Sequence, residues 1–266
     1  MVGRFLKKFY LYCIFIFLYA PIIVLMIFSF NESKSRGHWA GFSLKWYKAL
    51  FKDENIMLAL KNTLLIALLS SVIATVIGTA AAIGIHNMKK AKKTIVMNLT
   101  YLPVLNPDIV TGVSLMVLFI FARSFLNFEM GFMTLLISHI TFNIPYVIIS
   151  VMPKLKQLNK YTYEAAIDLG ASPATALLKV IVPEIMPGII TGFLMAVTLS
   201  IDDFVISFFT TGAGVQNLSI YIYSETRRGI NPTINALSTI MFLVVFLLLL
   251  LVNKGTSKGE ENLRRM

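Results

Sequence analysis

Residues 62–88 read NTLLIALLSSVIATVIGTAAAIGIHNM, a run of 27 residues without a charged side chain. A helix needs about 20 apolar residues to cross the roughly 30 Å hydrocarbon core of a bilayer. Three more uncharged runs reach that length, at residues 9–31, 130–153 and 229–253. In the whole chain of 266 residues, 57% are hydrophobic and 14% are charged, against about 25% charged in a soluble domain. The mean hydropathy is +0.76. These values exclude a soluble globular protein and predict an all-α polytopic membrane protein.

Two further apolar runs are interrupted by acidic residues. Residues 94–122 are uncharged except for Asp108, and residues 185–210 are uncharged except for Asp202 and Asp203. Asp108 divides the first run into halves of 14 residues, and neither half is long enough to cross a bilayer alone. We therefore interpret each run as one span with acid inside it. Pro103, Pro107 and Pro145 within the spans indicate kinked helices, whose freed carbonyls are satisfied by neighbours or water. A single transmembrane domain over residues 1–266 is expected, with six spans near residues 9–29, 62–85, 95–122, 131–151, 188–210 and 234–252.

The distribution of Lys and Arg predicts the orientation, because cytoplasmic loops carry an excess of both. With both termini in the cytoplasm, 15 of the 24 Lys and Arg residues lie inside and 9 outside. This topology makes residues 31–61 an extracytoplasmic loop and residues 152–187 a cytoplasmic loop. In a soluble protein, a net charge of +11 would suggest binding to nucleic acid. Here it is explained by cytoplasmic loops near anionic lipid, and no nucleic-acid partner is expected.

The N-terminus imitates a secretory signal peptide, with basic residues followed by an apolar run. The run is too long, however, and no small-residue cleavage site follows it, so an uncleaved first span is expected. The single cysteine, Cys13, lies inside this run. One cysteine cannot form an intrachain disulfide or a cysteine-rich metal site, and no metal or cofactor is expected.

The loop at residues 152–187 has the pattern of two short helices. Residues 163–169 favour a helix, and Gly170 is a natural residue to end it. Ser172 followed by Pro173 is typical of an N-cap and first helical position, which opens a second helix through residue 182. Pro183 and Pro187 are expected to break that helix before the fifth span begins. The loop is therefore predicted to form a helix-turn-helix shelf beneath the membrane.

This loop also carries a resemblance to a known family. Residues 164–166 (Glu-Ala-Ala), Gly170 and residues 180–183 (Val-Ile-Val-Pro) have the spacing of the EAA loop of ABC-importer permeases. Val180 and Val182 depart from the family, which usually has Ile and Leu there. The resemblance implies the type I ABC importer permease fold and a loop docked in a groove of a cytoplasmic ATPase. The residues that it assigns to ATPase coupling are Glu164, Ala165, Ala166, Asp168, Gly170 and Pro183.

Other segments resemble one branch of this family. Residues 106–110, 138–142, 198–203 and 235–239 are similar to the permeases of spermidine/putrescine importers, the PotC type, and with residues 21–23 and 29–31 the likeness covers nearly the whole chain. The resemblance implies a multi-pass protein of the prokaryotic cell (inner) membrane, surrounded by membrane lipid. It also implies three kinds of protein partner: a sister permease of the PotB type, two ATPase subunits of the PotA type and an extracytoplasmic polyamine-binding protein of the PotD type.

The acids within the spans are the candidate substrate-pathway residues. A carboxylate at mid-membrane depth is costly and marks a pathway or a partner. At 1.5 Å per residue along continuous helices, Asp108 and Asp202 lie about 21 Å from the inner face and His139 about 18 Å. Polyamines are chains of ammonium groups, which carboxylates and aromatic faces bind. The candidates are Asp108, Asp202, Asp203, His139, Tyr223 and Glu225.

These candidates have alternative roles. Adjacent helical residues point about 100° apart, so Asp202 and Asp203 cannot both face one pathway squarely, and the alternative for one of them is pairing with the sister subunit. His139 is more typical of an interhelical hydrogen bond than of a ligand. Tyr223 also suits an interfacial aromatic belt.

Three classes of function were compared. No G-x-x-x-x-G-K-[ST] motif occurs, so an ATP-driven transporter would need a separate ATPase. Six spans without a repeat are few for a secondary transporter, and three histidines on different segments, without H-E-x-x-H or G-x-S-x-G, argue against an enzyme. The expected function is the non-enzymatic permease subunit of an ATP-driven polyamine importer. The alternatives are an ABC permease for another cationic or small solute and an ATP-independent secondary transporter.

Overall fold

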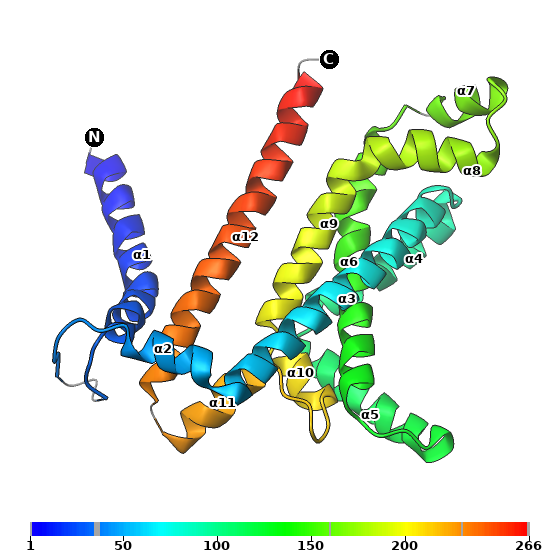
Figure 1. Cartoon of the computed structure of the whole chain (residues 1–266). Coiled ribbons are helices and arrows are strands. Elements are labelled where there is room, and N and C mark those ends of the chain that lie inside the picture. The colour runs from blue at the N-terminus through cyan, green and yellow to red at the C-terminus, as the bar shows by residue number, and fades with distance from the viewer. Residues whose placement is uncertain (1, 35–37, 160, 230, 265–266) are drawn as a thin grey trace. The chain divides into compact units, whose positions relative to one another are not determined.

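The computed structural model describes residues 2–34, 38–159, 161–229 and 231–264. Arg36, Lys160 and Arg265, which the count of loop charges includes, lie outside the described residues. The described chain is nearly all helical (Figure 1). Its helices are α1 (Val2–Ser29), α2 (Lys45–Lys52), α3 (Glu54–His86), α4 (Lys90–Leu105), α5 (Asp108–Leu126), α6 (Phe132–Gln157), α7 (Thr162–Asp168), α8 (Pro173–Ala176), the π-helix η1 (Leu177–Ile181), α9 (Val182–Asp202), α10 (Val205–Thr210), α11 (Leu218–Arg228) and α12 (Pro232–Arg264).

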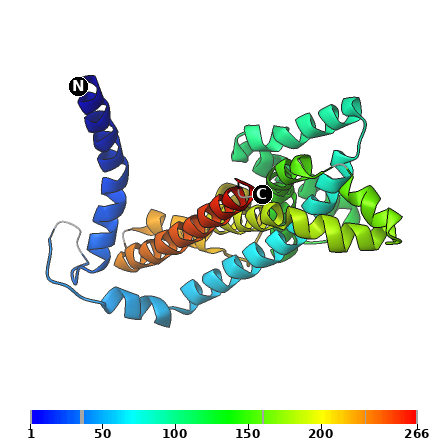
Figure 2. The same ribbon diagram turned by 90° about the horizontal axis from the view of Figure 1, so that it is seen from above.

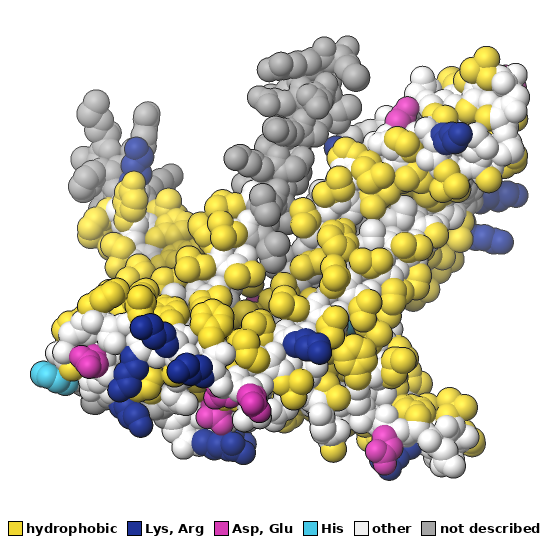
Figure 3. Space-filling model, viewed as in Figure 1, with side chains coloured by type: hydrophobic (Ala, Val, Ile, Leu, Met, Phe, Trp, Pro, Cys, Tyr) yellow, Lys and Arg dark blue, Asp and Glu magenta, His cyan; other side chains and the backbone are white. Residues whose placement is uncertain are grey.

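The polytopic class predicted from composition is confirmed. Among the described residues, five helical stretches are long and apolar enough to cross a membrane, and a sixth apolar stretch, Pro232–Leu247, is shorter. The five are Lys8–Ser29, Glu54–His86, Asp108–Leu126, Phe132–Gln157 and Pro173–Asp202. Apolar side chains cover much of the visible surface of α3 and α9 (Figure 3), as expected of helices that face lipid rather than water.

The third predicted span, residues 95–122, is divided between two helices, with the break at the proline where a kink was predicted. Helix α4 ends at Leu105 and α5 begins at Asp108. The break is at Asn106, whose extended backbone has φ −78° and ψ 146°, because the ring of Pro107 disfavours the α-helical conformation of the residue before it. Asp108 therefore occupies the first turn of a new helix, where the helix dipole favours a carboxylate. The depth estimated for Asp108 assumed a straight helix and does not apply.

The continuous fifth span predicted over residues 188–210 is also interrupted. Helix α9 ends at Asp202, Asp203 has extended backbone with φ −66° and ψ 123°, and α10 starts at Val205. The acidic pair thus marks the end of one helix and the approach to the next. No proline or glycine stands at this break, so the sequence offered no conventional signal for it.

The break predicted at Pro183 and Pro187 is wrong. Helices α8, η1 and α9 form one helical stretch, Pro173–Asp202. The π-helix ends at Ile181, and Pro183 is the second residue of α9. Pro187 lies about one helical turn later. A π-turn widens the helix, and kinks are typical where prolines and π-bulges occur. Figure 1 shows the helical ribbon turning between α8 and α9, so this segment bends the helix without ending it.

The chain divides into two compact units, residues 1–58 with 221–244, and residues 59–220 with 245–266. In the first, Trp46 of α2 is buried and its indole N–H donates to the backbone oxygen of Asn31 at 2.6 Å. The hydroxyls of Ser29 and Tyr47 lie 2.7 Å apart. These contacts hold the end of α1 against α2, which lies within the predicted extracytoplasmic loop of residues 31–61.

The second unit is built on close packing of α6 against α9, which lie side by side (Figures 1 and 2). A Cβ at Gly188 would lie 3.0 Å from the backbone oxygen of Ser150, and a Cβ at Gly192 would lie 3.2 Å from Cα of Val147. Small residues let membrane helices approach this closely. Helices α6 and α9 therefore form a tightly packed pair, with the short helices α7 and α8 connecting them.

Candidate functional site

Asp203 caps helix α10 at the break after α9. One carboxylate oxygen accepts from the backbone N–H of Ile206 at 3.1 Å, and the other accepts from the backbone N–H and the hydroxyl of Ser207 at 2.7 and 2.8 Å. The first N–H groups of a helix have no acceptor within the helix, and a carboxylate there is favoured by hydrogen bonding and by the helix dipole. The Asp203 side chain is only 6% exposed. Its charge is therefore used within the fold.

His139 joins Asp203 in a buried polar network. His139 is 1% exposed, and its Nε2 lies 3.0 Å from the Ser207 hydroxyl and 3.6 Å from the Asp203 carboxylate. Because the Ser207 hydroxyl donates to Asp203, its oxygen accepts from His139 Nε2–H and from the side-chain amide of Asn217 at 2.6 Å. The interhelical hydrogen bond expected of His139 is thus present between α6 and α10.

A second polar cluster lies one turn along α6. The side-chain amide of Asn143 donates to the Ser200 hydroxyl of α9 at 2.8 Å, and Ser200 lies 3.2 Å from the Ser70 hydroxyl of α3. This cluster links three helices through buried groups. The predicted site residues did not include Ser70, Ser200, Ser207 or Asn217. A serine within an apolar run, next to an acidic pair, was the available signal, because small polar residues join helices in membranes.

Asp202 and Asp108 differ from Asp203 because both are exposed. Asp202 is the last residue of α9 and Asp108 the first of α5. Helix α5 packs on α10 at Gly112, where a Cβ would lie 3.0 Å from the Phe209 ring and 3.4 Å from the backbone oxygen of Val205. The start of α5 therefore adjoins the start of α10, near the break that follows Asp202.

An aromatic side chain of α6 lies where α5 and α10 meet. Tyr146 packs against the buried cluster that contains Leu115 of α5 and Ile206 of α10. Aromatic rings and carboxylates can each bind an ammonium group.

The other two predicted pathway residues lie on α11, in the first compact unit. Glu225 accepts a hydrogen bond from Arg228 at 3.2 Å, and the guanidinium of Arg227 lies 5.0 Å from the centre of the Tyr223 ring. Burial raises the pKa of the neighbouring Tyr221 hydroxyl. Tyr223 and Glu225 therefore interact with arginines of their own helix.

The predicted coupling segment has the local structure that its sequence indicates. Gly170 has φ +86°. Its N–H donates to the Ile167 oxygen at 2.8 Å, and the Ala171 N–H donates to the Ala166 oxygen at 3.1 Å. This pair of bonds is the Schellman motif, which ends helices with a left-handed residue. The N-cap expected at Ser172 is also present, because its hydroxyl accepts from the Thr175 N–H at 3.3 Å.

The end of this segment is open to solvent. Glu164, Ala165 and Asp168 on α7 are exposed, as is Pro183 on α9. Leu169, between α7 and Gly170, is 90% exposed. Figures 1 and 2 both show α7 and α8 at an edge of their unit. The Leu169 side chain is therefore accessible to a partner.

Three known proteins similar to this chain are all permeases of polyamine transport systems. The chain is 37% identical over 263 residues to the spermidine/putrescine transport system permease protein PotC of Escherichia coli K12, covering 98% of both chains. It is 35% identical to the PotC protein of Haemophilus influenzae, covering 97% of this chain and 98% of that protein. The putrescine transport system permease protein PotI of Escherichia coli K12 is 38% identical, over 85% of this chain and 82% of that protein.

Solved structures share the fold. A chain of a bacterial alginate ABC transporter, in complex with a periplasmic protein that holds an alginate pentasaccharide, matches with a TM-score of 0.71 at 20% identity, covering 95% of this chain and 92% of that one. A chain of the inward-facing MetNI methionine ABC transporter matches with a TM-score of 0.55. The model of the family described as binding-protein-dependent transport system inner membrane component matches residues 74–254. With its helical spans and its shelf between α6 and α9, this chain belongs to that family of ABC-importer membrane permeases.

Proposed function

We propose that this chain is the membrane permease subunit of an ATP-driven importer of polyamines such as spermidine and putrescine. The observation that carries the proposal is the 37% identity to a spermidine/putrescine permease along 98% of both chains. Likeness over the full length includes the segments around both helix breaks and the shelf. The open carboxylates of Asp108 and Asp202 add a chemical reason, because the cargo is a chain of ammonium groups.

Two of the acids bind the cargo, and the third stabilises the fold around them. Asp108 and Asp202, both exposed at neighbouring helix breaks, bind successive ammonium groups of the cargo as it passes. Tyr146, which packs where α5 meets α10, offers a ring face to an ammonium group of the cargo and to the methylenes between its ammonium groups. Asp203 and His139 hold the break between α9 and α10, which keeps Asp202 at the end of its helix.

The shelf couples this pathway to ATP hydrolysis. A partner ATPase grips α7 and the turn at residues 169–171, where Leu169 is exposed. The α8–η1–α9 run is one helical stretch, and α9 is packed closely on α6. Movement of the shelf therefore moves α6 and α9 together. As a result, the cargo pathway at Asp108 and Asp202 opens alternately to the two sides of the membrane.

This mechanism requires the orientation that the loop charges predict. Both termini and residues 152–187 lie in the cytoplasm, where ATP is available, and residues 31–61 lie outside. Two ATPase subunits of the PotA type act on this chain and on a sister permease of the PotB type. A polyamine-binding protein of the PotD type delivers cargo from outside, where Tyr223 and Glu225 border its docking surface or the entrance.

The test is polyamine uptake in a bacterial strain that lacks its own importers. The chain is expressed with an ATPase of the PotA type, a sister permease of the PotB type and a binding protein of the PotD type from the same organism, and radiolabelled putrescine and spermidine are supplied. ATP-dependent accumulation that disappears with a hydrolysis-deficient ATPase is the expected result. Accumulation of an unrelated solute in place of polyamines would refute the cargo, and accumulation that persists without the ATPase would refute the coupling.

A further inference from the structure

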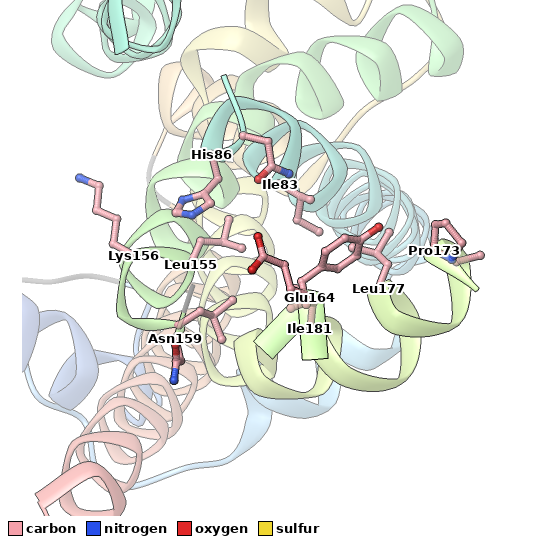
Figure 4. A pocket seen from close by; sticks show the side chains of 13 residues that line it. Ile83, His86, Leu155, Lys156, Asn159, Glu164, Pro173, Leu177 and Ile181 are labelled. Carbon is pink, nitrogen blue, oxygen red and sulfur yellow. The ribbon is translucent and has the colours of Figure 1, made fainter. Parts of the chain in front are cut away.

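A cavity of about 670 Å³ lies between the shelf and the ends of two spanning helices (Figure 4). Its walls come from the end of α3, the end of α6, and α7, α8 and η1. Most of its lining is apolar, including Ile83, Leu155, Leu177 and Ile181. A cavity of this size accommodates part of a lipid or another small amphipathic molecule.

One side of the cavity is basic. His86, the last residue of α3, and Lys156, in the last turn of α6, both line it. Lys93 adds charge from α4, because its ammonium donates to the backbone oxygen of His86 at 3.1 Å. Burial, and then the charges of Lys93 and Lys156, lower the pKa of His86 and favour its neutral form. The Nδ1 atom of His86 is buried and has no hydrogen-bond partner in the chain, so a polar atom of a ligand would satisfy it.

The opposite side of the cavity carries one acid. Glu164 reaches in from α7, and Figure 4 shows its carboxylate directed toward the side where His86 and Leu155 lie. Among the described residues, the Glu164 carboxylate forms no ion pair with His86 or Lys156. A ligand with only negative charge would meet Glu164, and one with only positive charge would meet Lys156 and Lys93. The cavity therefore suits a headgroup that carries both charges, held beside an apolar body.

The position of the cavity indicates the source of such a ligand. His86 and Lys156 stand at the ends of helices long enough to cross the membrane. The polar ends of spanning helices lie at the level of the lipid headgroups, and basic pockets between them bind phospholipid. We propose that this cavity binds an aminophospholipid, a glycerophospholipid whose headgroup joins a phosphate to a primary ammonium. The phosphate lies between His86 and Lys156, the ammonium meets Glu164, and one acyl chain lies on the apolar wall.

This site places a lipid between the coupling shelf and the spans that the shelf moves. It depends on the chain crossing a membrane and not on the identity of the cargo, so it stands or falls separately from polyamine transport. A bound lipid would fill the space under α7 and support the shelf against the end of α3.

The test is retention of lipid by the full chain, purified in detergent with the subunits that accompany it and examined by native mass spectrometry. Phosphatidylethanolamine and phosphatidylglycerol are supplied in equal amounts as probes. A retained phosphatidylethanolamine is expected, and Lys156→Ala and Glu164→Gln should each lower its occupancy about fivefold, since a headgroup charge contact at the membrane surface contributes about 1 kcal/mol. Lys154→Ala on α6 and Glu184→Gln on α9 are the matched controls, because neither side chain lines the cavity.

Three results would overturn the proposal. The first is equal retention of the two lipids, which would make the ammonium irrelevant. The second is an equal loss in the control variants, which would reflect general surface charge. The third is an absence of retained lipid together with protection of Ala174→Cys, a residue that lines the cavity, from thiol reagent by the ATPase, which would assign the cavity to the protein partner.

Discussion

Gly170 provides the sharpest test of the coupling assignment. It ends α7 with φ +86°, and a Cβ added there would meet nothing within 4 Å. A substitution therefore introduces no steric clash with the rest of the chain, and its cost is confined to the backbone. An L-residue in the left-handed conformation costs roughly 1–2 kcal/mol. That cost lowers the equilibrium constant between the closed and the open turn by a factor of about 5–30.

The predicted effect is graded by residue type. Gly170→Asn should be mildest, because asparagine tolerates the left-handed region. Gly170→Ala should be intermediate, and Gly170→Val most severe, because a β-branched residue rarely adopts positive φ. The readout is polyamine uptake for each ATP hydrolysed by the complex in proteoliposomes, together with the amount of ATPase that co-purifies. Uptake per ATP, or bound ATPase, should decline in the order Gly, Asn, Ala, Val.

Gly214→Val is the matched control. Gly214 has φ +93° and also has nothing within 4 Å of an added Cβ, but it lies in the loop before α11 and away from the shelf. The two valine variants impose similar backbone strain at different places. Equal losses in both would show a general effect of strain. Normal uptake per ATP and normal ATPase binding in Gly170→Val would refute the argument that this turn transmits the movement.

Three further predictions follow from packing and from the acids. Gly188→Ala should destabilise the chain by about 1–3 kcal/mol, because its Cβ would lie 3.0 Å from a backbone oxygen of α6, whereas Gly84→Ala, with nothing within 4 Å, should not destabilise; equal melting temperatures in detergent would contradict the close packing. Asp203→Ala should lower stability by about 0.5–2 kcal/mol through loss of the α10 cap, while Asp202→Ala at the exposed neighbouring position should leave melting unchanged and weaken uptake. The double variant Asp108→Asn/Asp202→Asn should raise the KM for polyamine in an assembled complex, and unchanged uptake kinetics would make these acids structural.

Local chemistry made the shelf predictable. The helix at residues 163–169, the turn at Gly170 and the N-cap at Ser172 each depend on residues adjacent in sequence, and each is present. Proline chemistry was only partly predictive. Pro107 stands at a real break, whereas Pro183 and Pro187 lie within a helical run that η1 and α9 continue. A proline weakens a helix locally, but the packing of α9 on α6 decides whether the helix continues.

The acids show the same division. Their place within apolar runs indicated that they have partners, because an unpaired carboxylate is costly in a membrane. Which acid is used by the fold was not readable, since Asp202 and Asp203 are adjacent and chemically identical. The structure distinguishes them by their contacts. Asp203 accepts hydrogen bonds from Ser207, which lies 4 residues later on α10, and its carboxylate lies close to His139 of α6.

Hydropathy, charge and turn chemistry act over a few neighbouring residues, so the sequence predicted helices that cross a membrane, the segments in which charge concentrates and the turn at Gly170. The structure adds the contacts between distant segments, which place His139 of α6 beside Asp203 and form a cavity between the shelf and the ends of α3 and α6. Those features depend on groups far apart in the chain, such as Ser70, Asn143 and Ser200, whose contact no local pattern specifies.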